Sequence, residues 1–290
     1  MSSPSSKPSK ATAAGATGSS NKVWWLVGAA AVLVGFALVA AVVANRSSSK
    51  SAATTTTPAG TDEAKAVVDK ATSVPASVSN AVGADAVKGA PTKIDGEPLA
   101  KDGKPEVLYV GAEFCPYCAA QRWALLEALS RFGTFEDVGL THSASNDVFP
   151  NTQTVSFHGS SYTSDYLTFT PVETASNVPD GNGSYEPLDT PTAEQAAIIQ
   201  KYDEGGGIPF IDIANQYVFS GVTLDPQLLQ GKTAAEIADA MQDPDSDIAK
   251  GVLGSANLIT ATICQVTEQK PAEVCNAPGV QQFAKGFAKS

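Results

Sequence analysis

The pattern of hydrophobic and polar positions divides the chain into four parts. Residues 1–22 are mostly Ser, Ala, Thr, Gly, Pro and Lys, with almost no large apolar side chain, so we expect a disordered N-terminus. Residues 23–44 are apolar and uncharged, and residues 45–61 return to small polar side chains that are typical of a flexible linker. Only residues 62–290 alternate apolar and polar positions as a globular domain requires.

The apolar run of residues 23–44 has the length of a transmembrane helix. As a helix it would span about 33 Å, which matches a hydrocarbon core of about 30 Å. Trp24 and Trp25 stand at one end, where interfacial aromatic residues are common. The basic flanks slightly favour a cytoplasmic N-terminus and an extracytoplasmic domain. The alternative is a cleaved signal peptide, since residues 42–44 resemble a cleavage site, but its apolar core would be unusually long.

Two adjacent stretches of the folded part have the clearest periodicity. Residues 106–112 form a short apolar run that is typical of a strand buried on both faces. In residues 119–132, Trp123, Leu126 and Leu129 recur at the spacing of an amphipathic helix. The tetrapeptide Cys-Pro-Tyr-Cys lies close to the junction between this strand and this helix.

The remaining pattern predicts short strands that alternate with helices. A polar and aromatic insertion occupies residues 147–190 and contains a predicted hairpin around its Gly-Ser dipeptide. Capping-box patterns predict two further helix starts, at Thr192 with Gln195 and at Thr233 with Glu236. We therefore expect an α/β fold with a central mixed sheet, the long insertion and a helical C-terminal extension.

The charge distribution limits the class of partner. The chain has 19 basic and 30 acidic residues, and the first 50 residues hold five of the basic residues and no acidic one. The rest therefore carries 19 − 5 = 14 basic residues against 30 acidic ones, a formal charge of −16. Such a domain does not suit nucleic acid, because few cations could neutralise the phosphates. A solubilising surface is the simplest interpretation, and an acidic face that selects basic clients is the alternative.

The first two of the four cysteines suit thiol exchange. Cys115 and Cys118 lie at the predicted strand-to-helix junction, where free backbone N–H groups and the helix dipole favour a thiolate. Pro116 suits the first helical turn, and Tyr117 completes the motif. We expect an exposed Cys115 to attack a client and Cys118 to resolve the mixed disulfide. A structural disulfide without turnover is the alternative.

The other two cysteines are interpreted differently. Cys264 and Cys275 lie eleven residues apart in a predicted helical tail that Pro271 interrupts. We expect a structural disulfide, worth about 3 kcal/mol by the loop-entropy argument. A second redox pair is the alternative. A zinc site that uses all four cysteines suits neither the spacing nor an exported protein, and we expect no metal and no cofactor.

At this point the sequence resembles thioredoxins. The segment VLYVGAEFCPYC is similar to their active-site segment, and its Pro-Tyr dipeptide is the one typical of glutaredoxins. Ile208 and Pro209 resemble the cis-proline motif of that superfamily, and Gly221 resembles the glycine that closes its later hairpin. The resemblance implies a thioredoxin-like fold in which Pro209 packs beside the active disulfide. A cis bond would let the backbone of Ile208 pair with an extended client.

A narrower resemblance covers most of residues 65–280. The segments VLYVGAEFCPYCAAQRWALLEALSRFGTF and IPFIDIANQY are similar to a prokaryotic thioredoxin-like family, the domain of unknown function 929. This resemblance implies the same fold and adds little about substrates.

Two features depart from thioredoxin. Thioredoxins carry a buried acid six residues before the first cysteine, where this chain has Tyr109. Glu113 is a candidate substitute, with an ordinary surface residue as the alternative. The interval from Cys118 to Pro209 is also long, and the insertion at residues 147–190 accounts for it. We expect this insertion to shape a client groove or to cover the site.

Together these patterns predict a membrane-anchored protein-disulfide oxidoreductase or isomerase outside the cytoplasm. Its clients would be exported cysteine-containing proteins, and a quinone-linked membrane partner could recycle it. Two alternatives remain: a non-enzymatic thioredoxin-like binding module at the cell envelope, and a metal-delivery domain.

Overall fold

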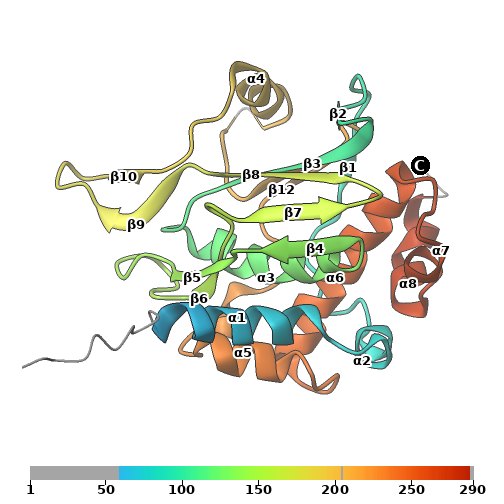
Figure 1. Cartoon of the computed structure of the whole chain (residues 1–290), viewed down its shortest axis with the longest axis horizontal. Coiled ribbons are helices and arrows are strands. Elements are labelled where there is room, and N and C mark those ends of the chain that lie inside the picture. Colours follow the sequence, from blue (N-terminus) through green and yellow to red (C-terminus); the bar gives the residue numbers. More distant parts are fainter. Residues whose placement is uncertain (1–58, 204, 288–290) are drawn as a thin grey trace, which may run out of the picture. The chain divides into compact units, whose positions relative to one another are not determined.

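The computed structural model describes residues 59–203 and 205–287 (Figure 1). The predicted N-terminus, the predicted membrane span at residues 23–44 and most of the predicted linker lie outside these residues. Residues 59–61, which we assigned to the linker, instead begin helix α1 (Ala59–Thr72). Within the described ranges, no helix combines the length and the hydropathy that crossing a membrane requires.

A mixed sheet forms the centre of the described domain. Its central strand β3 is flanked by one parallel strand, β8, and by one antiparallel strand, β11, so the predicted mixed sheet is confirmed. Beyond β11 lie β12 and then β1, and the short β2 pairs with the start of β3. The bounds are β1 (Thr92–Lys93), β2 (Ala100–Lys101), β3 (Lys104–Gly111), β8 (Thr168–Glu173), β11 (Phe210–Ile213) and β12 (Tyr217–Ser220).

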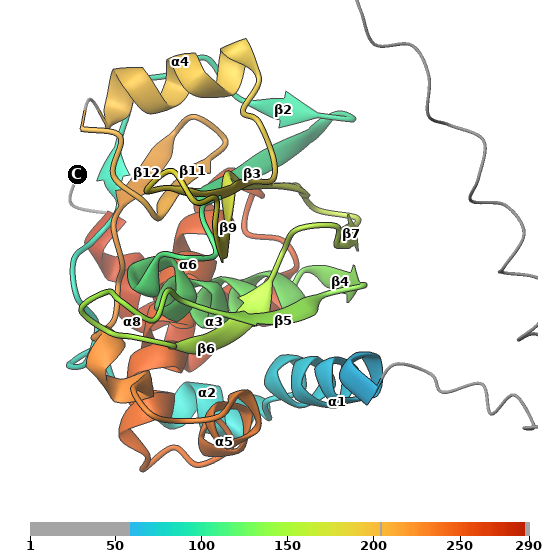
Figure 2. The same ribbon diagram turned by 90° about the vertical axis from the view of Figure 1, so that its left-hand side faces the viewer.

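Helices cover both faces of this sheet (Figure 2). On one face, α3 (Pro116–Ser130) and α6 (Asp247–Val266) pack against side chains such as Val107 and Tyr109, and they form the main core. On the other face, α4 (Ala193–Tyr202) packs against a smaller cluster that includes Leu108, Val110 and Phe210. This explains the continuous apolar run in β3, because successive side chains enter opposite cores.

The segment that we predicted as an insertion contains a strand of the central sheet. Strand β8 lies within residues 147–190 and runs parallel to β3, with Val172 beside Val110. Within the described residues β8 pairs with β3 alone, and such an edge position tolerates Pro171. The predicted hairpin used only the first two residues of β8, so the sequence pattern did not distinguish this strand from the rest of the insertion.

The hairpin that we predicted around Gly159 is wrong. Strand β6 (Gln153–Ser156) pairs with β5 (Gly139–His142), and β7 (Ser161–Ser164) pairs with β4 (Gly133–Glu136). The turn at Gly159 therefore joins strands of two different ribbons. Each strand finds its partner before residue 147, which local sequence does not reveal. A third ribbon, β9 (Ala175–Pro179) with β10 (Tyr185–Pro187), projects beside the sheet (Figure 1).

The C-terminal part is helical, as predicted. Both capping boxes are confirmed: Thr192 with Gln195 opens α4, and Thr233 with Glu236 opens α5. The remaining elements are α2 (Ala76–Ala81), the 3-10 helix η1 (Pro226–Leu229), α5 (Ala234–Ala240), α7 (Ala272–Cys275) and α8 (Pro278–Phe287). At the centre of the domain, α3 begins at Pro116, shortly after the central strand β3 ends at Gly111.

Candidate functional site

The cysteine pair lies at the N-terminus of α3. Cys115 is the N-cap residue and Pro116 is the first helical residue. The backbone N–H of Cys118 donates a hydrogen bond to the sulfur of Cys115 over 3.2 Å, and both cysteines are free thiols. The helix start thus directs an otherwise unpaired N–H group at the sulfur, which favours a thiolate there.

The expectation of an exposed Cys115 is wrong in this structure. Cys115 retains only 5% of its surface and Cys118 retains none. The Cys115 thiol lies 3.8 Å from the carbonyl oxygen of Ile208 and donates a weak hydrogen bond to it. This segment limits access to the sulfur from one side.

The structure brings Ile208 and Pro209 to the cysteine pair, although Pro209 lies 91 positions after Cys118 (209 − 118 = 91). The bond between Ile208 and Pro209 is cis, as the resemblance implies. Strand β11 begins at Phe210, which pairs with Val110 near the end of β3. Because β3 leads directly into the Cys115 segment, this register holds the cis bond beside the start of α3.

The two thiols have opposite pKa shifts. The pKa of Cys115 is lowered, chiefly by a hydrogen bond with the Cys118 thiol and with help from the positive charge of Arg122, although burial opposes this. Burial, together with the hydrogen bond to Cys115, raises the pKa of Cys118 well above the usual range. The arrangement therefore favours a thiolate at Cys115 and a protonated thiol at Cys118.

A buried ion pair beneath the thiols was missed at the sequence level. Arg122 donates two hydrogen bonds to Glu173, from Nε to Oε1 and from Nη2 to Oε2, both at 2.7 Å, and neither side chain is exposed. The guanidinium also lies 6.0 Å from the ring centre of Tyr109. The spacing offered a signal, since Arg122 follows Cys118 by four residues and shares its helix face. Its partner at the end of β8 could not be identified from the pattern.

Tyr109 lies six residues before Cys115, where the resemblance to thioredoxins implies a buried acid, and it is fully buried. Its hydroxyl and Nη1 of Arg122 are both buried and have no hydrogen-bond partner among the described residues. Burial raises the pKa of Tyr109 well above its usual range, so this phenol stays protonated. The candidate substitute, Glu113, is half-buried, and its carboxylate accepts a hydrogen bond from Ser156 over 2.6 Å.

The loop before β6 and the ribbon of β9 and β10 contact residues that flank Cys115 in the sequence. The backbone N–H of Ala144 donates to the carbonyl of Phe114 over 2.8 Å, and the ring of Phe114 stacks on Tyr185 with ring centres 4.5 Å apart. Tyr117 and Phe149 meet edge to face with ring centres 5.9 Å apart. These contacts place aromatic side chains at the residues next to the cysteine motif.

One segment of the chain, which holds the cysteine pair and its aromatic borders, is similar to a known family. Residues 90–200 match the model of a family described as a domain of unknown function, DUF929. The match includes Cys115, Cys118, Arg122 and Glu173 and ends before Ile208. No curated protein and no solved structure matches the chain. The DUF929 similarity supports the narrower of our two resemblances and assigns no activity.

The second cysteine pair lies outside the DUF929 match. Cys264 and Cys275 form a disulfide with Cα atoms 5.7 Å apart, and both residues are buried. The bond links α6 to α7. In this state neither sulfur is free to serve as a thiolate ligand, so the structure does not contain the four-cysteine zinc site that we considered.

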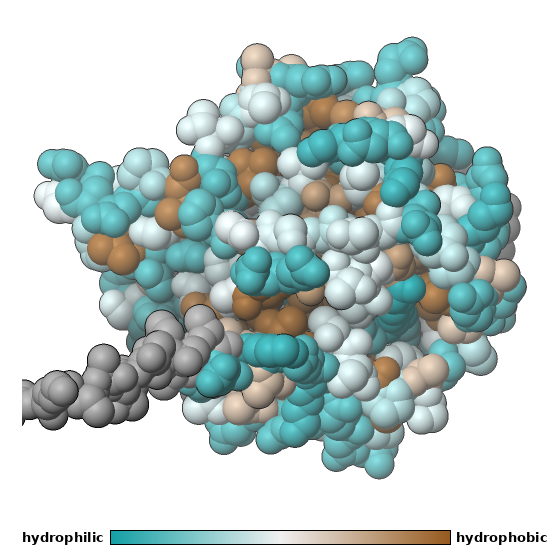
Figure 3. Space-filling view, in the orientation of Figure 1, coloured by the Kyte–Doolittle hydropathy of each residue, from teal (hydrophilic) through white to brown (hydrophobic). Residues whose placement is uncertain are grey.

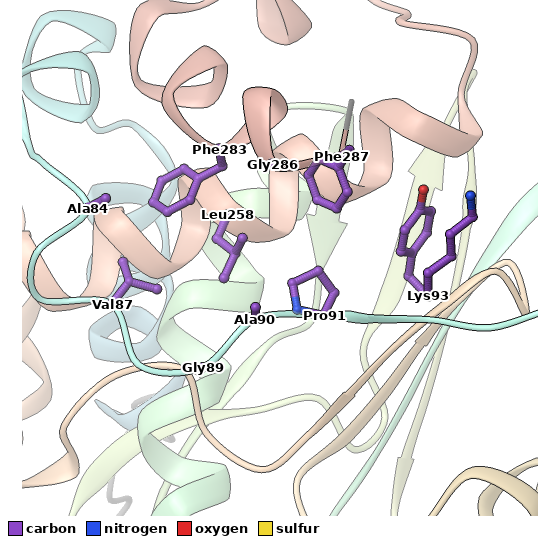
Figure 4. Close-up of a pocket in the computed structure, with 11 residues that line it drawn as sticks. Ala84, Val87, Gly89, Ala90, Pro91, Lys93, Leu258, Phe283, Gly286 and Phe287 are labelled. Carbon is purple, nitrogen blue, oxygen red and sulfur yellow. The ribbon is translucent and has the colours of Figure 1, made fainter. Parts of the chain in front are cut away.

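An apolar cavity of about 360 Å³ also lies largely outside the DUF929 match. It is enclosed by α6, α8 and the extended segment before β1, with Val87, Leu258 and Phe283 among its lining residues (Figure 4). Lys93 is the charged group among the described residues that line it, and these include no cysteine. The cavity therefore offers no group for thiol exchange.

Proposed function

We propose that this protein is a thiol-disulfide oxidoreductase of the thioredoxin-like superfamily that acts through Cys115 and Cys118. The observation that carries the proposal is the environment of the Cys115 sulfur. It accepts an N–H hydrogen bond at a helix start, shares a hydrogen bond with a protonated Cys118 and faces Ile208 beside the cis bond to Pro209. These are the properties of an attacking thiol with a resolving partner.

The architecture supports the same assignment. The resemblance implies a buried strand before the cysteines, a helix after them and an antiparallel strand pair after Pro209. Strand β3, helix α3 and the pair β11–β12 have this order and this pairing. Thioredoxin-like therefore describes the fold that we propose for the domain.

The reaction would proceed by two exchanges at sulfur. A client thiolate attacks Sγ of Cys115 in the oxidised protein, the bond between Cys115 and Cys118 breaks, and Cys118 leaves and takes up a proton. A second client thiolate then attacks the client sulfur of the mixed disulfide and releases Cys115 as a thiolate. The client loses two electrons, which the Cys115–Cys118 pair gains. An external disulfide or a quinone-linked membrane partner must then reoxidise the pair.

The second cysteine pair supports a function outside the cytoplasm. The buried disulfide between Cys264 and Cys275 is typical of an oxidising compartment. We propose that residues 23–44 anchor the protein with its domain extracytoplasmic, and that exported cysteine-containing proteins are its clients. We do not propose nucleic acid as a partner, because the acidic domain has few cations to neutralise phosphates.

A Cys118→Ala variant tests the proposal. In the reduced variant the Cys115 thiolate can attack a client disulfide and displace one client sulfur as a thiolate. Without Cys118 to attack the Cys115 sulfur and release the client, this mixed disulfide should accumulate, visible as bands that a reductant abolishes. The double variant Cys115→Ala/Cys118→Ala is the control and should form none. The proposal fails if the Cys118→Ala variant forms no adduct and the purified wild type is also inactive in two assays. In these assays the protein with a Cys115–Cys118 disulfide should oxidise dithiothreitol, and the protein with two free thiols should reduce insulin.

One observation favours a non-enzymatic binding module as the second candidate. Cys115 is only 5% exposed, so a client must displace part of its surroundings to reach the sulfur. A binding module would keep its cellular function in a Cys115→Ser/Cys118→Ser variant, whereas an oxidoreductase would lose it.

A further inference from the structure

We propose that the loops bordering Cys115 select client segments that are cationic and carry an apolar side chain beside the reacting cysteine. The inference rests on the proposed function and assigns its substrate class. The surface concerned, here called the rim, consists of the loop before β6, the ribbon of β9 and β10, and residues at the start of α3. Its residues are Phe114, Tyr117, Asn146, Asp147, Val148, Phe149, Val178, Tyr185 and Glu186.

The rim contains the large hydrophobic side chains that remain exposed to solvent in the described part of the domain. Among the described residues, the large hydrophobic side chains that stay exposed are Tyr117 at 40%, Val148 at 64% and Val178 at 48%. All three belong to the rim. Hydrophobic side chains also stand out among hydrophilic ones on the projecting ribbon of β9 and β10 (Figure 3). Exposed apolar groups gathered in this way mark an interaction surface.

Specific contacts fix the two loops of the rim around the cysteine motif. Tyr185 stacks on Phe114, and its hydroxyl donates a hydrogen bond to the side-chain oxygen of Asn146 over 3.1 Å. Asn146 thereby ties the loop before β6 to the ribbon of β9 and β10. Tyr117 contacts Phe149, the neighbour of Val148. Phe114 and Tyr117, which flank Cys115 closely in the sequence, are thus in contact with both of these segments.

The segment that supplies most of the rim is acidic in composition. Residues 147–190 contain six acidic residues and no Lys or Arg: Asp147, Asp165, Glu173, Asp180, Glu186 and Asp189. Glu173 is paired with Arg122 in the interior, and Asp189 lies 3.1 Å from His158. Asp147 and Glu186 remain exposed, directly next to Val148 and Tyr185.

The acidic and apolar groups together indicate which kind of client segment would bind at the rim. Asp180 is exposed at the turn of the ribbon, and N–H groups of Asn182 and Ser184 lower its pKa, so it adds a fixed negative charge. The carbonyl of Ile208 lies 3.8 Å from the sulfur of Cys115 and suits a client backbone. An extended polypeptide with Lys or Arg near an apolar residue complements both features. Negative charges of this kind raise the rate of encounter with cations and lose their effect in salt.

Single-cysteine peptides reacting with the oxidised full-length protein provide the test. A peptide with Leu beside Cys and two Lys at least four residues away is compared with its Glu counterpart and with a Ser-for-Leu counterpart. Each rate is divided by the rate of the same peptide with hydroxyethyl disulfide, which removes differences in thiol reactivity. At low salt the Lys peptide should react about tenfold faster than the Glu peptide, and the difference should shrink at high salt.

Matched variants assign the preference to the rim. Asp147→Asn/Glu186→Gln should remove most of the charge preference, and Val148→Ser/Val178→Ser should reduce the preference for Leu over Ser. Asp165→Asn is the control, because this exposed acid precedes β8 at the end of the sheet away from Cys115 and should leave both ratios unchanged.

The outcomes separate the two proposals. Equal normalised rates for all peptides, with normal oxidation of dithiothreitol, would overturn the substrate class and leave the oxidoreductase standing. The substrate class is also overturned if Asp165→Asn lowers the preference as much as the rim variant does. A protein that reacts with neither the peptides nor dithiothreitol would overturn both proposals.

Discussion

At Cys115, hydrogen-bond donors and a nearby cation lower the pKa of one sulfur, while burial raises it. The Cys118 thiol, the Cys118 N–H group and the Arg122 guanidinium lower its pKa. The first two follow from the spacing of the motif and the helix start, so they could be predicted from the sequence. Arg122 offered only the signal of its spacing from Cys118, because its buried partner Glu173 lies 51 residues further along the chain.

We predict that neutralising this ion pair raises the pKa of Cys115. In Arg122→Met/Glu173→Gln the interior loses both charges, so the positive potential at the sulfur falls while packing is largely kept. The rate of alkylation by iodoacetamide against pH should rise at a higher pH than in the wild type, closer to the value of about 8.5 for a free thiol.

The single variant Arg122→Met separates this electrostatic effect from loss of structure. It leaves Glu173 charged and unpaired in the interior and should cost about 3–5 kcal/mol in the free energy of urea unfolding, much of which the double variant should recover. An alkylation profile of the double variant that overlays the wild type would contradict the role of Arg122.

Among the elements, those set by neighbouring residues were predicted and those set by distant partners were not. The capping boxes at Thr192 and Thr233 satisfy backbone groups within one turn, so their sequence signature suffices. The pairing of β6 with β5 and of β7 with β4 depends instead on partner strands that lie earlier in the chain. A plain turn at Gly159 fits either pairing, so the sequence pattern favoured the shorter connection.

The ribbon of β4 and β7 gives a prediction at this scale. A Cβ at Gly133 would collide with the backbone carbonyl oxygen of Thr163 on the partner strand, so Gly133→Ala must separate the strands. We expect a loss of about 2 kcal/mol in the free energy of unfolding. Gly139→Ala in β5 is the matched control, since its nearest neighbour would be Ser156 Cβ at 3.9 Å. Equal stability of the two variants, measured by urea denaturation, would contradict the observed pairing.

For the molecule as a whole, the sequence predicted the order of the parts better than their contacts. It predicted the mixed sheet, the helical C-terminal part and the approach of Ile208 and Pro209 to Cys115. It did not predict that β8 belongs to the central sheet, because an edge strand with a proline has no continuous apolar run. It also overestimated the exposure of Cys115, since the Ile208 carbonyl that faces its sulfur lies far along the chain.

Removing the second disulfide tests how the C-terminal helices contribute. Replacing Cys264 and Cys275 by Ala should lower the free energy of unfolding by about 3 kcal/mol, because the unfolded chain gains the freedom of the opened loop. The reaction of Cys115 with dithiothreitol should keep its rate, measured below the unfolding range. A loss of that reaction in the folded variant would instead indicate an electron relay through the second pair.

The pairing of Arg122 with Glu173 has a consequence for how related sequences can diverge. Its cation belongs to the helix of the cysteine motif, and its anion belongs to β8, inside the long segment that interrupts the domain. A deletion in that segment that removed β8 during evolution would leave the guanidinium of Arg122 buried without its ion-pair partner. Homologues that keep Cys-Pro-Tyr-Cys but have trimmed this region should therefore have exchanged the arginine as well, and an alignment would show the two positions changing together.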